Sequence, residues 1–257
     1  MSLYEQFRLD GKVAVVTGGG RGIGRGIALG LAECGADVVV IARRQDDVDA
    51  VAKEIEARGQ RGLGLAADVL QWDQIPTALD RVVDTFGGLD IMVNNAGGNL
   101  DGQMYGLPEI SMDKFDEQLN LNMKSKFWGA QQAAKRMRDN GRIISIISIA
   151  AHKPSPGFGV YSAANMGMIS MTRTMAVELA PRGITVNCIA PGTVVTDMLV
   201  NTLKISEEDA VNQFGKRIPM GRTGDPMDCA AAAVFFASPA AAWITGQFLD
   251  VAGGEPT

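Results

Sequence analysis

The sequence alternates short apolar runs with longer amphipathic stretches, and this alternation restricts the fold more than any other feature. Seven runs rich in Val, Ile and Leu are typical of buried strands, at residues 12–17, 37–42, 63–69, 89–93, 141–148, 184–190 and 247–251. Between them apolar residues recur at helical spacing, at residues 22–34, 46–58, 73–86, 112–139, 161–180 and 227–237. Strands that alternate with helices predict an α/β fold with a doubly wound parallel sheet and helices on both faces.

The chain of 257 residues has no linker-like or low-complexity segment, so we expect a single domain over residues 1–257. Its net charge of −5 argues against a nucleic-acid partner, because such binding needs a basic surface. Three cysteines without a C-x-x-C pair and a single histidine, His152, predict neither a disulfide framework nor a metal site, and they favour the cytoplasm. No apolar run is long enough to predict a membrane span.

A glycine-rich turn follows the first predicted strand and opens the first predicted helix. It has the pattern T-G-x-x-x-G-x-G, in which small residues let the backbone and the helix N-terminus approach a pyrophosphate. Its position between a Val-rich strand and an amphipathic helix predicts a dinucleotide site rather than a mere tight turn. The candidate cofactor-binding residues of this turn are Thr17, Gly18, Gly20, Arg21, Gly22, Ile23 and Gly24.

The end of the second predicted strand indicates which dinucleotide binds. An acidic side chain there would accept hydrogen bonds from the adenosine ribose and would repel a 2′-phosphate. This sequence instead has the small Ala42 followed by Arg43 and Arg44, which leave room for a phosphate and can pair with it. Arg21 can approach the same phosphate. We therefore expect NADP(H) rather than NAD(H), with two merely exposed arginines as the alternative.

These motifs, with three others in the same order, resemble the short-chain dehydrogenase/reductase family in its single-domain branch. Asn94-Asn95-Ala96-Gly97 closes the fourth predicted strand, Ser148 lies thirteen residues before Tyr161, and Pro191-Gly192 precedes Thr196. The resemblance covers residues 9–254. It implies a Rossmann-like sheet of order 3-2-1-4-5-6-7 and hydride transfer between a nicotinamide and a small carbonyl or alcohol substrate. It also implies a homotetramer or homodimer, in which the helices predicted at 112–139 and 161–180 pair across an interface.

The resemblance implies roles for individual residues. Asn122 corresponds to the asparagine that carries a proton-relay water, Ser148 to the serine that hydrogen-bonds the substrate oxygen, and Tyr161 to the acid/base. The other cofactor-binding residues that it implies lie at the adenine ring, along the fourth-strand turn and on the nicotinamide side: Asp68, Val69, Asn95, Ala96, Gly97, Tyr161, Asn165, Pro191, Gly192, Val194 and Thr196.

The sequence departs from the family at one catalytic position. The family motif is Y-x-x-x-K, but here Asn165 stands four residues after Tyr161. The family lysine holds the nicotinamide ribose and lowers the pKa of the tyrosine. Asn165 can replace the first role through hydrogen bonds but carries no charge for the second. Two other basic residues could replace the lysine. Arg173 lies about 18 Å along the helix from Tyr161, which is too far. Lys153, on the loop before Tyr161, is a hypothetical substitute.

Without the lysine, we expect Tyr161 to keep a pKa near ~10 and to be protonated at neutral pH. Because a neutral phenol donates a proton and a phenolate accepts one, this favours carbonyl reduction over alcohol oxidation. If Asn165 is merely a lost lysine, Asn165→Lys is expected to raise turnover.

Two other functions stay open on the same scaffold. One is an NADP(H)-binding pseudoenzyme or regulator, which Asn165 favours and the intact Asn122, Ser148 and Tyr161 disfavour. The other is enoyl reduction or a lyase step. His152 is either a substrate contact or an ordinary loop residue, and Met198, Leu199 and Leu203 favour an apolar substrate pocket after Thr196.

Overall fold

The computed structural model describes residues 2–99, 104–196, 200 and 206–255. Its centre is a seven-stranded sheet of order β3-β2-β1-β4-β5-β6-β7, in which every pairing is parallel. This confirms the predicted doubly wound topology. The strands are β1 Val13–Thr17, β2 Asp37–Ala42, β3 Gly62–Ala66, β4 Ile91–Asn94, β5 Arg142–Ile146, β6 Thr185–Pro191 and β7 Phe248–Val251.

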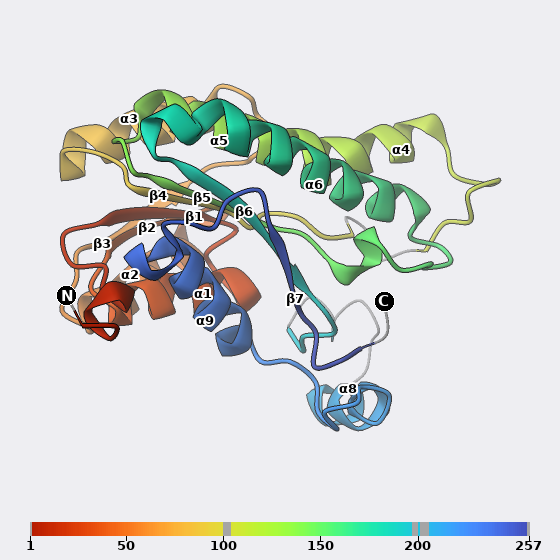
Figure 1. Ribbon diagram of the computed structural model, residues 1–257. Helices are drawn as coiled ribbons and strands as arrows, with labels where there is room; N and C mark the ends of the chain where they lie inside the picture. The colour runs from red at the N-terminus through yellow and green to blue at the C-terminus, as the bar shows by residue number, and fades with distance from the viewer. Residues whose placement is uncertain (1, 100–103, 197–199, 201–205, 256–257) are drawn as a thin grey trace.

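Two layers of helices cover the sheet, as Figure 1 shows. One face carries α1 Gly22–Glu33, α2 Gln45–Glu56 and α9 Pro226–Ala237. The other carries α3 Gln74–Phe86, α5 Ser125–Arg136 and α6 Gly159–Leu179, with α4 Met112–Leu119 extending beyond the sheet. The chain also contains short 3-10 helices: η1 Glu5–Phe7, η3 Ile149–Ala151, η4 Ala180–Arg182 and η5 Pro239–Ala241.

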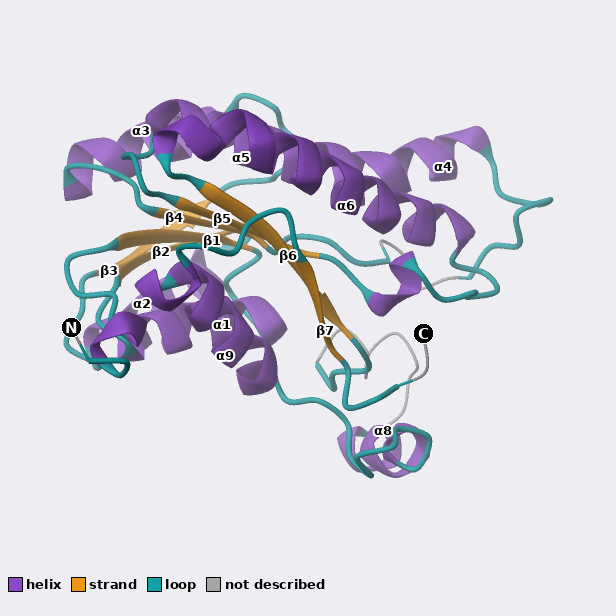
Figure 2. Ribbon diagram, in the orientation of Figure 1, coloured by secondary structure: helices purple, strands orange, loops and turns teal. Residues whose placement is uncertain are grey.

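The apolar runs of the central strands are explained by burial on both faces of the sheet (Figure 2). All five residues of β1 are buried, and they alternate between the two cores. Ala14 and Val16 pack toward α1 and α9, whereas Val13 and Val15 pack toward the layer of α3, α5 and α6. A strand covered on both sides needs apolar residues at consecutive positions, which is why it shows no alternation of polar and apolar residues.

The prediction of one continuous helix over residues 112–139 is wrong. The structure has α4, then one turn of π-helix (η2, Asn120–Lys124), then α5, which ends at Arg136. The π-turn carries Asn122, whose Oδ1 accepts from the backbone N–H of Gly98 at 2.8 Å and whose Nδ2 donates to the Gly98 carbonyl at 3.0 Å. These bonds to the loop after β4 hold the extra residue in the helix, and apolar periodicity carries no signal of them.

A second difference is α8 Glu207–Gly215, a helix that the sequence analysis did not predict. Ser206 caps this helix, because its hydroxyl accepts from the backbone N–H of Asp209. Met198, Leu199 and Leu203, which favoured an apolar pocket, lie outside the described residues. Within the described part of the chain, no helix is both long and apolar enough to span a membrane. All three cysteines are free.

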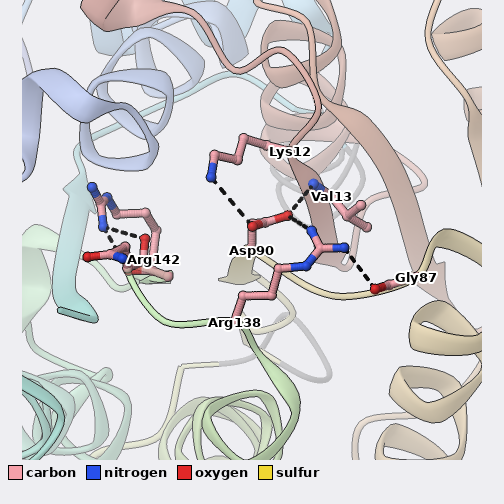
Figure 3. A network of polar contacts seen from close by, with 8 residues as sticks. Lys12, Val13, Gly87, Asp90, Arg138 and Arg142 are labelled. Carbon is pink, nitrogen blue, oxygen red and sulfur yellow. Dashed lines mark hydrogen bonds and ion pairs between the residues drawn. The ribbon is translucent and has the colours of Figure 1, made fainter. Parts of the chain in front are cut away.

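One buried carboxylate joins the amino ends of β1 and β4 to the loop that leads into β5 (Figure 3). Asp90, just before β4, is 5% exposed and accepts from the backbone N–H of Val13 at 3.0 Å. Its carboxylate also pairs with Arg138 at 2.7 Å and with Lys12 at 3.5 Å. Arg138 in turn donates to the carbonyl of Gly87 at 2.8 Å. A buried charge that is paired and hydrogen-bonded on several sides holds the strands in register.

We therefore expect Asp90→Ala to lower the free energy of unfolding by about 3 kcal/mol, because it leaves Arg138 and the Val13 N–H without their partner. Urea unfolding measures this change. Asp10→Ala, which removes the exposed pair between Arg8 and Asp10, is the control and is expected to cost less than about 1 kcal/mol. Equal losses in the two variants would contradict the assignment.

Candidate active site

A hydrogen-bonded junction joins the turns that follow β1 and β4. The side-chain amide of Asn95 donates to the carbonyl oxygens of Thr17 and Gly18 at 3.0 and 3.2 Å. The Thr17 hydroxyl accepts from the backbone N–H groups of Asn95 and Ala96 at 3.1 and 3.2 Å. Thr17 is buried and lies outside the cavity lining, so its contacts fix the two turns relative to each other.

The glycine turn needs its glycines for two physical reasons. Gly18 and Gly22 have φ of +64° and +53°, in the left-handed region that favours glycine. Gly24 lies so close to the junction that a Cβ on it would collide with the Gly18 carbonyl oxygen. The turn thereby brings the N-terminus of α1 to the sheet edge, and no side chain caps its first N–H groups. An uncapped helix N-terminus in a cavity suits an anion such as a pyrophosphate.

A cavity of about 440 Å³ lies at the carboxyl ends of β1 to β5. The predicted residues that the structure brings together along its wall are Gly18, Gly20, Arg21, Gly22, Ile23, Gly24, Ala42, Arg43, Arg44, Asp68, Val69, Asn95, Ala96, Gly97, Tyr161 and Thr196. The predicted residues outside this lining are Thr17, Asn122, Ser148, Asn165, Pro191, Gly192 and Val194. Wall residues that the sequence analysis did not single out are Ile41, Asp47, Ala67, Leu70, Gly98, Leu121, Lys126, Ile146 and Ile147.

One end of the cavity is positively charged. Arg44 pairs with Asp47 of α2 at 2.6 Å, which neutralises one arginine. Arg21 and Arg43 are exposed, and within the described residues neither has a hydrogen bond or ion pair. Because Gly20 packs against Ala42 and Asp47, the glycine turn and the start of α2 form one wall. Two unpaired guanidinium groups at this wall can bind a phosphate.

The other end of the cavity holds the phenol of Tyr161, on the first turns of α6. Burial raises the pKa of Tyr161 above its ordinary value, and hydrogen bonding by the side chains of Ser148 and Asn165 opposes that rise. The sequence analysis predicted a pKa near the ordinary value for Tyr161, and the structure corrects this to a raised pKa. The phenol is therefore protonated at neutral pH and can donate its proton.

Asn165 is fully buried and turns back onto its own helix. Its Nδ2 donates to the Tyr161 carbonyl at 2.8 Å, and its Oδ1 is buried without a hydrogen-bond partner. Lys153, the hypothetical substitute for the family lysine, pairs with Glu255 at 3.0 Å instead. Glu255 also accepts from the backbone N–H of Thr193, so Lys153 ties its loop to the C-terminal segment and lies outside the cavity lining.

Among the wall residues that the sequence analysis missed, Lys126 on the first turn of α5 is a buried charged one. Its side chain is 4% exposed and lines the cavity beside Gly97, where an added Cβ would lie 3.0 Å from the Lys126 Nζ and 3.0 Å from the Asn122 Oδ1. Burial lowers the pKa of Lys126 to about 8. The signal that could have found it is its spacing of four residues from Asn122, which places both on one helical face.

His152 belongs to a different surface. Its Nε2 lies 3.0 Å from a carboxylate oxygen of Asp250, and its ring packs against Phe248 with 5.5 Å between centroids. It lies outside the cavity lining. Over the described ranges, no three His, Cys, Asp or Glu side chains gather in the manner of metal ligands.

Comparison with known proteins places this geometry in a family. Residues 18–255 match the family profile described as enoyl-(acyl carrier protein) reductase. The 3-oxoacyl-[acyl-carrier-protein] reductase of Staphylococcus epidermidis is 40% identical over 246 residues, covering 95% of this chain and 98% of its own. Versicolorin reductase of Emericella nidulans is 36% identical and covers 99% of both chains.

Solved structures agree. A short chain dehydrogenase from Burkholderia cenocepacia, in complex with NADP, superimposes with a TM-score of 0.87 at 38% identity, covering 96% of this chain and 99% of its own. A short-chain dehydrogenase/reductase from Serratia marcescens gives 0.89 at 37% identity, covering 97% and 99%. The chain therefore belongs to the short-chain dehydrogenase/reductase family, whose named relatives are oxidoreductases.

The buried Lys126 predicts how stability depends on pH in the cofactor-free protein. Its pKa falls from 10.5 in the unfolded chain to about 8 in the folded one, so folding disfavours the protonated form by about 3 kcal/mol below pH 8. The cost shrinks as pH rises from 8 and is gone above 10.5. We expect Lys126→Met to raise the free energy of unfolding at pH 7 by an amount approaching this figure, and to give no gain at pH 10.5.

Urea unfolding of both proteins across this pH range measures the difference. The control is Lys124→Met, two residues away, where the exposed ammonium lies 4.5 Å from the Trp72 ring centroid. It is expected to change stability by less than about 1 kcal/mol at every pH. A Lys126→Met protein less stable than the wild type at pH 7 would contradict the unpaired burial of this lysine.

Proposed function

We propose that this protein is an NADP(H)-dependent oxidoreductase that reduces the carbonyl group of a small-molecule substrate. The observation that carries the proposal is the shared cavity, which joins the phenol of Tyr161 to the uncapped N-terminus of α1. An anion site and a proton donor on one wall suit a dinucleotide and a substrate that react side by side.

The residues of the cavity fit the dinucleotide at both of its charged parts. The N–H groups at the start of α1, beside Gly22 and Gly24, suit the pyrophosphate. Arg21 and Arg43 suit the 2′-phosphate that distinguishes NADP(H) from NAD(H). The Burkholderia relative, solved in complex with NADP, supports the same choice. When bound, the reduced cofactor supplies the hydride.

The proposed direction of the reaction follows from the state of the phenol. Because burial raises its pKa, Tyr161 holds a proton at neutral pH and gives it to the carbonyl oxygen as the hydride reaches the carbonyl carbon. Ser148, close enough to hydrogen-bond the phenol, is proposed to hold the substrate oxygen, and Asn122 to support a proton-relay water. Oxidation of an alcohol would need the phenolate and is proposed only at alkaline pH. Relatives named as reductases support this direction.

A second candidate function is enoyl reduction. It is favoured by the description of the matching family profile and by the absence of the family lysine at Asn165. A panel of ketones and enoyl substrates, followed by NADPH oxidation, separates the two reductions. Tight NADPH binding with no turnover on any member of the panel would instead favour the binding or regulatory alternative.

We also propose a homotetramer, or a homodimer, in the cytoplasm. Exposed apolar side chains on α6 support the pairing of subunits, among them Met166, Met171 and Val177. Three free cysteines support a reducing compartment. Light scattering coupled to size exclusion measures the assembly.

Tyr161→Phe tests the proton donor. We expect it to lower carbonyl reduction by about 10²–10⁴-fold, because the phenol is the acid, and to change NADPH affinity far less. Steady-state rates and fluorescence titration measure the two effects. Tyr4→Phe, at an exposed tyrosine far from the cavity, is the matched control. Reduction that survives Tyr161→Phe would overturn the assignment.

Arg43→Ala tests the choice of cofactor. Loss of a charge-assisted hydrogen bond to the 2′-phosphate is expected to raise the NADPH dissociation constant about tenfold and to leave that of NADH unchanged. Arg25→Ala, which removes an exposed arginine paired with Glu54, is the control. An unchanged ratio of NADPH to NADH affinity would speak against Arg43 as the phosphate ligand.

A further inference from the structure

Lys126 is a buried charge of an unusual kind in this protein. Three charged side chains of the described residues are buried: Asp90, Lys126 and Arg142. Asp90 is paired with two cations, and Arg142 donates to the carbonyls of Asn140 and Gly141. For Lys126 the described residues offer neither an ion pair nor a hydrogen bond. A lone buried ammonium is costly, so its retention calls for a partner from outside the chain.

The sheet beneath Lys126 does not neutralise it. Asn94, Ser145 and Cys188 stand in register across β4, β5 and β6. They alternate with residues of the opposite face, so they point to the side of α5 and α6. Asn94 Nδ2 and Ser145 Oγ are buried without hydrogen-bond partners. The row is therefore polar and short of partners, but it carries no negative charge at neutral pH.

The ionisable neighbours of Lys126 are also neutral at pH 7. On β6, the Cys188 thiol lies close enough to act on its pKa, but burial raises the pKa of that thiol to about 11. Cys188 is held by the Thr172 hydroxyl of α6 at 3.0 Å. The phenol of Tyr161, which lines the same cavity, is also protonated.

The ammonium reaches the cavity because Gly97 has no side chain. The Nζ of Lys126 and the Oδ1 of Asn122 both lie beside the Cα of Gly97, in the space that a Cβ would occupy. Tyr161 lines the same cavity from α6, and Asn165 lies one turn further along that helix, buried and uncharged. A cation therefore lines the same cavity as Tyr161, although the position of the family lysine carries none.

We propose that Lys126 is the ammonium group of this active site, supplied by α5 in place of α6, and that it donates hydrogen bonds to the bound dinucleotide beside Gly97 and stabilises the phenolate of Tyr161. In the reduction, Tyr161 gives its proton to the carbonyl oxygen and becomes an anion, while the hydride forms the new C–H bond. Lys126 stays protonated and offsets that negative charge until the phenol regains a proton from water. This rests on the proposed function.

The first test measures binding without turnover. Lys126→Met is expected to raise the dissociation constant for NADPH about tenfold, the loss of one charge-assisted hydrogen bond. Hydrogen bonds to the cofactor also favour the charged lysine, so the wild type is expected to take up close to half a proton when NADPH binds at pH 8. Calorimetry in buffers of different ionisation enthalpy measures this uptake.

The uptake is expected to vanish in Lys126→Met and to persist in Lys124→Met, the neighbouring exposed lysine. The 2′-phosphate of NADPH is present in every titration, so its contribution to proton uptake is the same in both variants. The difference in uptake between the two variants therefore reports on Lys126 alone. Equal affinity and equal uptake in the wild type and Lys126→Met would overturn the proposal.

The second test moves the cation back to α6. Lys126→Met is expected to lower kcat for reduction about 10²-fold, and the double variant Lys126→Met/Asn165→Lys to regain most of it. Asn165→Lys alone is expected to lower activity or stability, because it adds a second ammonium to one buried region. The sequence by itself predicted a gain for this variant, so a gain would overturn the proposal.

The outcomes separate this proposal from the proposed function. If Tyr161→Phe abolishes reduction but Lys126→Met leaves kcat and the NADPH dissociation constant unchanged, the reductase assignment holds and the role of Lys126 fails. If Tyr161→Phe leaves reduction intact, the proposed function fails first. Loss of activity in Lys126→Met without rescue by Asn165→Lys, with the protein folded by circular dichroism, would also overturn the exchange of one lysine for the other.

Discussion

The site depends on the junction between the turns after β1 and β4. Asn95 bonds to the carbonyls of Thr17 and Gly18, and the Thr17 hydroxyl bonds back to the turn after β4. Because neighbouring parallel strands end at the same edge, these few bonds set the distance between the glycine turn and Gly97. The N-terminus of α1 follows one of these turns, and the Lys126 ammonium lies beside Gly97 in the other.

The buried charges at the two ends of the strands have opposite surroundings. At the amino edge, Asp90 is buried with Lys12, Arg138 and the Val13 N–H around it, and its charge serves the fold. At the carboxyl edge, Lys126 is buried with no such partners among the described residues, and burial lowers its pKa. A charge kept in that state opposes folding, and perturbed groups of this kind gather where ligands bind.

Local pattern predicted the strands, their parallel pairing and most of the helices, because strands buried on both faces have consecutive apolar residues. The order of the strands was implied by the family resemblance. It failed where distant contacts decide the backbone. The π-turn at Asn120–Lys124 depends on Asn122 bonding to Gly98, and the end of α5 at Arg136 lies short of the predicted limit. The helix α8 was not predicted, because a short polar helix gives too weak a periodicity to be separated from a loop.

The sequence by itself determined the doubly wound sheet, the glycine turn, the arginines after β2 and the missing charge at Asn165. Each of these can be read from short stretches of the sequence. Only the tertiary structure decided that Lys153 forms an ion pair with Glu255 and that Lys126 is buried at the cavity wall. The physical reason is that helical spacing places a lysine on a face but does not say whether water or protein covers it. That depends on how α5 packs against the sheet and on Gly97, in the turn after β4.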